Sequence, residues 1–378
     1  MKLIVQPADG IAPILAAIKG AKTSVEIAIF RFDRKDVEAA LKAAAARGVR
    51  VTALIAMTSR GGEKSLRALE LRFLDAGIIV SRTSGDLSRY HGKYILVDRR
   101  VLYVLSFNFT HLDIDHSRGF GIVQTGPLHI KEAVKLFKAD CTRTKYTPKS
   151  DTFVVSPANA RRVLGTFLKK AKTQLLMYDP AVSDGEMLRI LSERAKAGVE
   201  VKIIGKVTGK TSLDAQKLSG MRLHTRTIIR DRQEAFVGSQ SLRAGELDSR
   251  REVGLILREP KIVKKLLETF ETDWTETRPK SQPAESDAQA AEAEGEPSSP
   301  KEIAKAVGVF TKELEPLAAT VKKAVRQAVL KAGDDVLHDK DIKDTMKQVV
   351  KDAVKEAVKE AVHDAQDAQD AAPAKGAE

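Results

Sequence analysis

Hydrophobic positions recur along residues 1–276 in two similar series of predicted strands and helices. In the first series, residues 25–29 alternate between apolar and polar or small side chains, which is the period-2 pattern of a half-buried strand. In the second series, residues 175–177 form a short apolar run at the corresponding place. A helix and a further strand are predicted next in both series, over 41–55 and 191–204.

The two series are copies of one another, offset by 150 residues. The matching positions are Pro7 and Pro157, the Ala-Lys-Thr tripeptides at 21–23 and 171–173, and Gly48 and Gly198. Two β-α-β series must each cover a sheet with helices, so the repeat predicts one α/β fold present in duplicate. We expect the halves to comprise residues 1–150 and 151–276.

Composition changes after residue 276. Residues 277–300 have almost no large apolar side chain and are rich in Pro, Ala, Ser and Glu, which predicts a disordered linker. Residues 301–378 are of low complexity and rich in Ala, Val, Lys and Glu, which favours a helical tail. Its valines at 350, 354, 358 and 362 form a stripe that drifts around a helix, so we interpret the tail as solvated, with a weak docking face.

The charge of the chain is concentrated in the part that precedes the linker. Of the 64 Lys+Arg and 51 Asp+Glu, 16 and 20 lie in 277–378, which leaves 48 basic and 31 acidic residues in 1–276. The net charge of this first part is therefore near +17. Such an excess suggests a polyanionic partner, either nucleic acid or an anionic lipid surface.

Cysteine content and the N-terminus bear on location. Cys141 is the only cysteine, which excludes an intrachain disulfide and a cysteine metal cluster and fits a reducing compartment. The chain reaches Pro7 and Asp9 before any apolar run long enough for a signal peptide, and no apolar stretch approaches bilayer length. We expect a cytoplasmic protein without a transmembrane segment, with peripheral membrane contact left open.

Each copy of the repeat ends in the same spaced set of polar residues. The first copy contains His91 and Lys93, then Asp98, then Leu105-Ser106-Phe107-Asn108. The second copy contains His224 and Arg226, then Asp231, then Gly238-Ser239-Gln240-Ser241. The internal spacing is identical, and two copies in register make a coincidence improbable.

This pattern resembles the HxK(x)4D(x)6GSxN motif of the phospholipase D superfamily, which normally occurs twice. The resemblance covers residues 1–276 and not the tail. It implies a duplicated α-β-α sandwich with pseudo-twofold halves and an active site between them. It also implies a phosphodiesterase that works through a phosphohistidine intermediate, without a metal or another cofactor.

Cleavage of a phosphodiester needs a nucleophile, a proton donor and cations around the non-bridging oxygens. His91 and His224 could supply the first two roles, and by the resemblance Lys93 and Arg226 would hold the phosphoryl oxygens. The remaining candidates are Asp98 and Asp231 as parts of the catalytic motifs, and Ser106, Asn108, Ser239 and Ser241 as donors to the phosphate.

Several positions depart from the superfamily pattern. Arg226 replaces lysine, Ser241 replaces asparagine, and Leu105 replaces glycine and would add bulk beside the first site. The departures could weaken the second motif.

An acidic residue is also placed unequally. In relatives, an acid near this position in one half orients the histidine of the other half, so Glu252, which follows Arg251, would serve His91. That makes His91 the better nucleophile candidate. The matching position after Arg118 is Gly119, so His224 would lack a partner unless Asp113 or Asp115 takes that place.

The resemblance leaves the substrate open. Our first expectation is hydrolysis or transphosphatidylation of a phospholipid, and the alternatives are a metal-independent nuclease or a catalytically weakened, anion-binding relative. Aromatic residues are only 5% of the chain, which gives little sign of a base-stacking surface. Residues 204–211, IGKVTGKT, miss the spacing of a phosphate-binding loop by one position.

Overall fold

The computed structural model describes residues 1–58, 62–209 and 212–276. The predicted disordered linker, 277–300, and the predicted helical tail, 301–378, lie outside the described residues and stay predictions.

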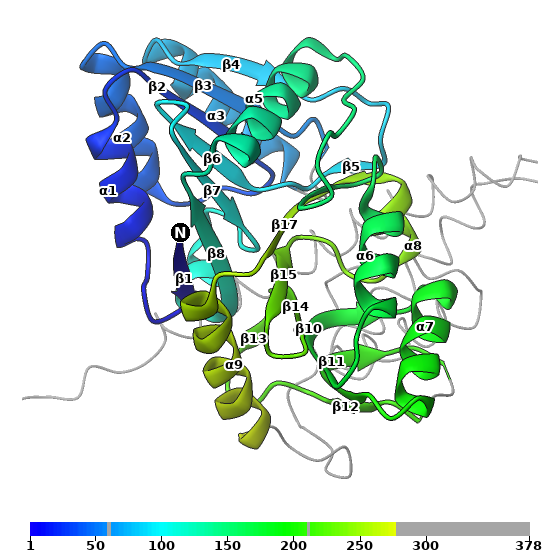
Figure 1. Ribbon diagram of the computed structural model, residues 1–378. Coiled ribbons are helices and arrows are strands. Elements are labelled where there is room, and N and C mark those ends of the chain that lie inside the picture. Colours follow the sequence, from blue (N-terminus) through cyan, green and yellow to red (C-terminus); the bar gives the residue numbers. More distant parts are fainter. Residues whose placement is uncertain (59–61, 210–211, 277–378) are drawn as a thin grey trace, which may run out of the picture. The chain divides into compact units, whose positions relative to one another are not determined.

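The first half of the chain forms a mixed sheet (Figure 1). Its strands lie in the order β1 (Lys2–Gln6), β8 (Ser117–Gln124), β7 (Val101–Leu105), β6 (Tyr94–Val97), β2 (Ser24–Ile29), β3 (Arg50–Ile55) and β4 (Ile79–Arg82). β2, β3 and β4 are parallel, and the other neighbours in this order pair antiparallel. β2 and β3 are mostly apolar and buried because both faces of this part of the sheet are covered, whereas β4 at the edge is partly exposed.

The second half forms a sheet with the same topology. Its order is β9 (Phe153–Val155), β17 (Val253–Leu257), β15 (Glu234–Gly238), β14 (Arg226–Arg230), β10 (Gln174–Val182), β11 (Glu200–Val207) and β12 (Asp214–Gln216). Each strand has its counterpart at the same place in the first sheet, and the parallel pairs again lie at one side. The predicted duplicated α/β fold is confirmed.

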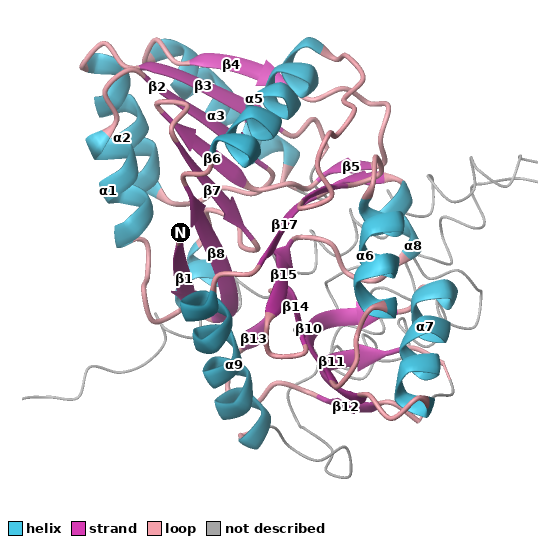
Figure 2. Cartoon of the chain, viewed as in Figure 1, coloured by secondary structure: helices cyan, strands magenta, loops and turns pink. Residues whose placement is uncertain are grey.

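Helices cover both sheets (Figure 2). The outer helices are α1 (Ala12–Gly20), α2 (Lys35–Ala46) and α3 (Glu63–Asp75) on the first sheet, and α6 (Ala160–Lys169) and α7 (Gly185–Lys196) on the second. Two longer helices, α5 (Pro127–Thr142) and α9 (Pro260–Thr275), pack into the central core together with the inner faces of both sheets. Among the described residues, α3 has no counterpart in the second half.

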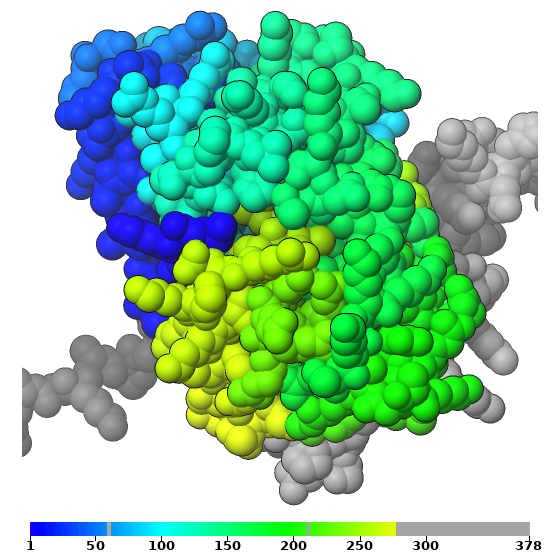
Figure 3. All heavy atoms as spheres, in the orientation of Figure 1, coloured from blue at the N-terminus to red at the C-terminus, as the bar shows by residue number. Residues whose placement is uncertain are grey.

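The two halves exchange short strands. β5 (Arg89–Tyr90) of the first half pairs with β16 (Arg250–Arg251) of the second, while β13 (Arg222–Leu223) of the second half pairs with the start of β8 in the first. Figure 3 shows blue and cyan atoms of the first half directly beside yellow and green atoms of the second. β5 and β13 end just before His91 and His224, and β16 ends at Arg251, just before Glu252. The exchange therefore fixes the two motifs to each other.

Candidate active site

His91 stands at the centre of a buried chain of polar contacts drawn from both halves. It follows β5, and its backbone N–H donates to the carbonyl oxygen of Arg251 (2.7 Å). Its Nδ1 lies 2.9 Å from Oε2 of Glu252, and its Nε2 lies 2.8 Å from Nζ of Lys93. Because the Lys93 ammonium can only donate, Nε2 accepts and Nδ1 carries the proton toward Glu252. The lone pair of Nε2 therefore points toward the Lys93 ammonium, beside which the phosphate of a substrate would bind.

Burial perturbs both charged neighbours of this histidine. It raises the pKa of Glu252 to about 7 and lowers the pKa of Lys93 to about 7, since neither charge is solvated there. The edge of the Phe30 ring packs against His91 at a centroid distance of 4.6 Å, and Lys93 Nζ lies 5.6 Å from the same ring centroid. Phe30, itself buried, thus places an apolar ring beside both side chains.

His224 is held by the first half in the corresponding way. Its backbone N–H donates to the carbonyl oxygen of Arg118 (3.1 Å). Its Nδ1 lies 3.4 Å from Oδ2 of Asp113, close enough for attraction but without the geometry of a hydrogen bond. Burial lowers the pKa of His224 well below its usual range.

Asp113, and not Asp115, therefore lies beside His224. Its carboxylate accepts hydrogen bonds from the backbone and side-chain amides of Asn108 (2.7 Å each) and from Arg222 (2.7 Å). Burial alone would raise the pKa of Asp113, but the charges of His224 and Arg222 and the Asn108 amide lower it to about 2. Asp115 instead contacts Arg34 (2.8 Å) and His111 (3.1 Å).

The position equivalent to Glu252 is closed by packing in the first half. A Cβ atom added to Gly119 would lie 3.0 Å from Cδ1 and 3.3 Å from Cβ of Phe107, so a larger side chain there would force Phe107 to shift. The counterpart of Phe107 is Gln240. The two half-sites therefore differ in shape as well as in charge.

Lys93 and Arg226 occupy equivalent places. Each donates to the carbonyl oxygen of its own motif histidine, Lys93 to His91 (2.8 Å) and Arg226 to His224 (2.7 Å). Arg226 Nε also donates to the hydroxyl of Ser241 (3.2 Å). The structure thus brings the predicted Lys93, Arg226 and Ser241 together at the site.

The predicted phosphate donors have local partners. The hydroxyls of Ser106 and Ser239 accept the backbone N–H groups of Phe120 (2.8 Å) and Val253 (3.1 Å), which ties each motif to the neighbouring strand. Among the described residues, eight buried side-chain nitrogen or oxygen atoms make no hydrogen bond, and three of them belong to this site: Asn108 Oδ1, His224 Nδ1 and Glu252 Oε1.

Asp98 and Asp231 are not brought to the site. They occupy the β6–β7 and β14–β15 turns, at the strand ends opposite to Lys93 and Arg226, with φ near +50°. The Asp98 carboxylate accepts three backbone N–H groups, at 22 to 24, and Asp231 accepts the three at 172 to 174. We therefore assign both residues to the fold rather than to the chemistry.

Leu105 also differs from expectation. Instead of adding bulk beside the first site, its side chain is buried in the outer core, with α1 to α3. It is accommodated by Gly121 on the paired strand, where an added Cβ would lie 2.8 Å from Leu105 Cδ2.

The sequence reasoning missed the acids that support the site. Arg118 forms a bidentate, buried pair with Asp273 of α9 (2.7 and 2.8 Å), and Arg251 pairs with Asp140 of α5 (3.0 Å). Each pair joins one half to the other. Glu246, the counterpart of Asp113, accepts the backbone N–H of Ser241 (2.7 Å). Glu246 could have been found, because both acids lie five residues beyond their motifs.

Comparison with known families gives one match that covers most of the chain. Residues 14–141 and 164–274 match the family described as cardiolipin synthase, PLD-like domain. Among curated proteins, no sequence matches. No helix of the described residues has the length and apolar character needed to span a membrane. Those residues also contain no group of three or more His, Cys, Asp or Glu placed to hold a metal ion.

Solved structures share the fold. Polyphosphate kinase from Porphyromonas gingivalis is 18% identical with a TM-score of 0.62, over 77% of this chain, and this chain spans only 54% of that protein's length. Phosphatidylserine synthase from Haemophilus influenzae Rd KW20 is 9% identical with a TM-score of 0.57, over 73% of this chain and 86% of that one.

Proposed function

Since the chain belongs to the family of phospholipase D-like domains of the cardiolipin synthase type, we propose that it is a phospholipase D-type phosphodiesterase. The family is part of a superfamily of phosphoryl-transfer enzymes, and the proposed reaction is the hydrolysis or transphosphatidylation of a phospholipid. The observation that carries the proposal is the contact chain from Glu252 through His91 to Lys93, with distances of 2.9 and 2.8 Å. It supplies a histidine with a defined tautomer, a carboxylate behind it and a cation in front of it.

In the first step, Nε2 of His91 attacks phosphorus and forms a P–N bond while the P–O bond to the leaving group breaks. Lys93 and Arg226 hold the non-bridging oxygens, whose charge grows in the transition state. The Nδ1 proton of His91 stays on the hydrogen bond to Glu252, which stabilises the positive charge that develops on the ring. The departing oxygen takes a proton from His224.

His224 must be protonated for that step, although burial lowers its pKa. A bound phosphodiester adds a negative charge beside the ring and raises the pKa, and Asp113 holds the Nδ1 side. In the second step, His224 takes a proton from water or an alcohol, the new oxygen attacks phosphorus and the P–N bond breaks.

A phospholipid is favoured over the alternatives by the family match. A nuclease is the second candidate, supported by the charge near +17 of residues 1–276. An anion-binding relative without turnover is the third, because Ser241, Gly119 and the 3.4 Å His224–Asp113 distance make the second half-site less complete.

Parallel assays of the purified full chain separate these candidates. The substrates are vesicles of phosphatidylcholine or phosphatidylglycerol, plasmid DNA, and bis(p-nitrophenyl) phosphate as a simple diester. We expect turnover of the aryl diester and of a phospholipid, with activity unchanged by excess EDTA. Cleavage of DNA alone would favour the nuclease, and failure on all four would favour the binding protein.

For bis(p-nitrophenyl) phosphate, whose leaving group needs no proton from His224, the pH dependence of kcat/KM should be a narrow bell centred near pH 7. Glu252, with a pKa of about 7, must be ionised, so activity falls below that pH; Lys93, with a pKa of about 7, must be charged, so activity falls above it. Lys93→Arg keeps its charge at all these pH values and should retain some activity while losing the basic limb. An unchanged basic limb in Lys93→Arg would show that another group titrates there.

Asp113→Asn should lower turnover by about 10²-fold for substrates with an alcohol leaving group. It should lower turnover much less for bis(p-nitrophenyl) phosphate, whose leaving group departs without a proton. The reason is that Asp113 acts by orienting His224 as the proton donor. Asp115→Asn is the matched control and should leave both rates unchanged. Equal losses on both substrates would indicate a purely structural role for Asp113.

A further inference from the structure

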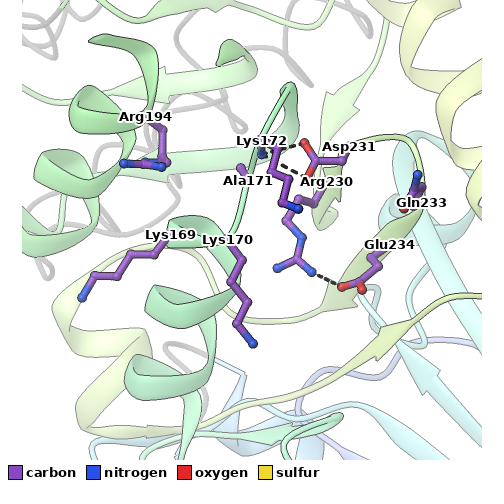
Figure 4. Close-up of a pocket in the computed structure, with 9 residues that line it drawn as sticks. All are labelled: Lys169, Lys170, Ala171, Lys172, Arg194, Arg230, Asp231, Gln233 and Glu234. Atoms are coloured by element: carbon purple, nitrogen blue, oxygen red, sulfur yellow. Dashed lines mark hydrogen bonds and ion pairs between the residues drawn. The ribbon is translucent and has the colours of Figure 1, made fainter. Parts of the chain in front are cut away.

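A basic hollow of about 500 Å³ lies in the second half, at the end of its sheet away from the candidate active site (Figure 4). Arg226 begins β14 at the active site, whereas Arg230 ends it at the hollow. The separation along the strand is roughly 13 Å. We propose that this hollow is a second binding site, and that it takes a phosphate-bearing group with two or more negative charges.

The charges around the hollow are largely uncompensated. Four cationic residues line it whose side chains make no hydrogen bond or ion pair to any described residue: Lys169, Lys170, Lys172 and Arg194. The two acids are already satisfied. Asp231 accepts backbone N–H groups, and Glu234 contacts Arg230 and Arg258. The cations are therefore available to an anion.

A buried arginine forms the floor. Arg230 is 8% exposed, its guanidinium stacks 4.3 Å from the Phe167 ring centroid, and it donates to the Phe167 carbonyl oxygen (2.8 Å). Figure 4 shows the side chains of Lys170 and Lys172 on the same side as this guanidinium. Arg230, whose charge Glu234 partly balances, thus lies beside two lysines whose side chains have no partner among the described residues.

The first half provides an internal comparison. It has the same turn, with Asp98 accepting the same three backbone N–H groups. Yet the residues at the positions of Phe167, Lys170, Arg194 and Arg230 are Ala17, Gly20, Ala44 and Val97. The fold is therefore built without these charges. A lysine at the end of α1 or α6 complements the helix dipole in both halves, but the dipole does not account for Arg194 and Arg230.

Phosphate oxygens are the ligand that such a set binds best, because lysine and arginine make charge-assisted hydrogen bonds to them. The hollow has room for more than one phosphate. A short soluble oligophosphate and the headgroup of an anionic phospholipid share this chemistry, so the test includes both.

Acetylation of lysines in the unmodified full chain measures directly whether a ligand covers this site. The protein is acetylated at low salt with and without tripolyphosphate, and the labelling rate of each lysine is followed by mass spectrometry. We expect Lys170 and Lys172 to be labelled several-fold more slowly with tripolyphosphate. Lys19 and Lys22, the counterparts of Lys169 and Lys172 in the first half, should be unaffected. Equal protection of all four lysines, or of none, would overturn the proposal.

Variants identify the source of the phosphate. Lys170→Glu/Lys172→Glu should weaken tripolyphosphate binding at this site by about tenfold or more, while the matched control Lys19→Glu/Lys22→Glu should not. Both should turn over bis(p-nitrophenyl) phosphate like the parent chain, and the milder Lys170→Gln/Lys172→Gln serves if charge reversal impairs folding. If co-sedimentation with phosphatidylglycerol vesicles falls in the first variant alone, the ligand is a lipid headgroup; if only tripolyphosphate binding falls, it is soluble. Equal behaviour of both variants in both assays would refute the site.

Discussion

His91→Ala should lower turnover of every phosphodiester substrate by about 10⁴-fold or more, because it removes the nucleophile itself. His91 is buried between Glu252 and Lys93, and no other histidine in the described part of the chain makes these contacts. Quenching the parent enzyme in alkali during turnover of a labelled phosphodiester should trap a phosphoramidate on this residue, since P–N bonds survive base. The variant should show no trapped label.

The control for this substitution is His111→Ala. The His111 side chain is 62% exposed and lies beside Asp115 and Arg34, so its loss should leave the rate nearly unchanged. His224→Ala is the informative companion, because it removes the proton donor and not the nucleophile. It should still form the phosphoramidate from an aryl diester and then release it slowly. Label retained in His91→Ala and lost in His224→Ala would reverse the assignment of the two roles.

Asp273→Ala should lower the free energy of unfolding by about 3–5 kcal/mol. Asp273 is 2% exposed and accepts two hydrogen bonds from Arg118 and one from the hydroxyl of Tyr178 (2.6 Å). Its removal leaves the Arg118 guanidinium buried without its counterion. Activity should fall as well, because the carbonyl oxygen of Arg118 holds His224. Urea unfolding followed by circular dichroism measures the stability.

Two further variants make this prediction specific. Glu271, on the same helix, pairs with Arg232 at the surface, with both side chains more than half exposed (53% and 54%). Glu271→Ala should change stability by no more than about 1 kcal/mol. Replacing both buried partners, in Arg118→Met/Asp273→Leu, should restore much of the stability because no charge is left unpaired. A loss for Glu271→Ala as large as that for Asp273→Ala would contradict our account of the buried pair.

The sequence was sufficient for the duplicated fold, because matching positions in the two copies report the same packing twice. The resemblance to the superfamily also led to the hypothesis that Glu252 pairs with His91. The structure places these two side chains in contact. The sequence was insufficient for Asp98, since a short spacing along the chain does not say which end of a hairpin a carboxylate occupies.

Contacts between the halves were harder to foresee. Asp140 and Asp273 lie on helices far from either motif along the chain. They are 133 residues apart, like His91 and His224, so the repeat marks them as counterparts, but it does not identify Arg251 and Arg118 as their partners. Likewise, the choice between Asp113 and Asp115 depends on the orientation of α4 (His111–Asp115), which is one short turn. Such contacts are set by tertiary packing rather than by local pattern.

The exchanged strands have a consequence for how the two histidines can come to differ. Each half completes the other's motif, so a single half would have to associate with an identical copy to assemble the same arrangement. In such a homodimer, the residue that orients the histidine would be the same in both subunits, because one codon specifies it. Both sites would then have the acid, or neither would. Joining the halves in one polypeptide releases this constraint, and glycine at 119 can stand opposite glutamate at 252. Covalent fusion thus permits a division of labour that a symmetric assembly of identical subunits forbids.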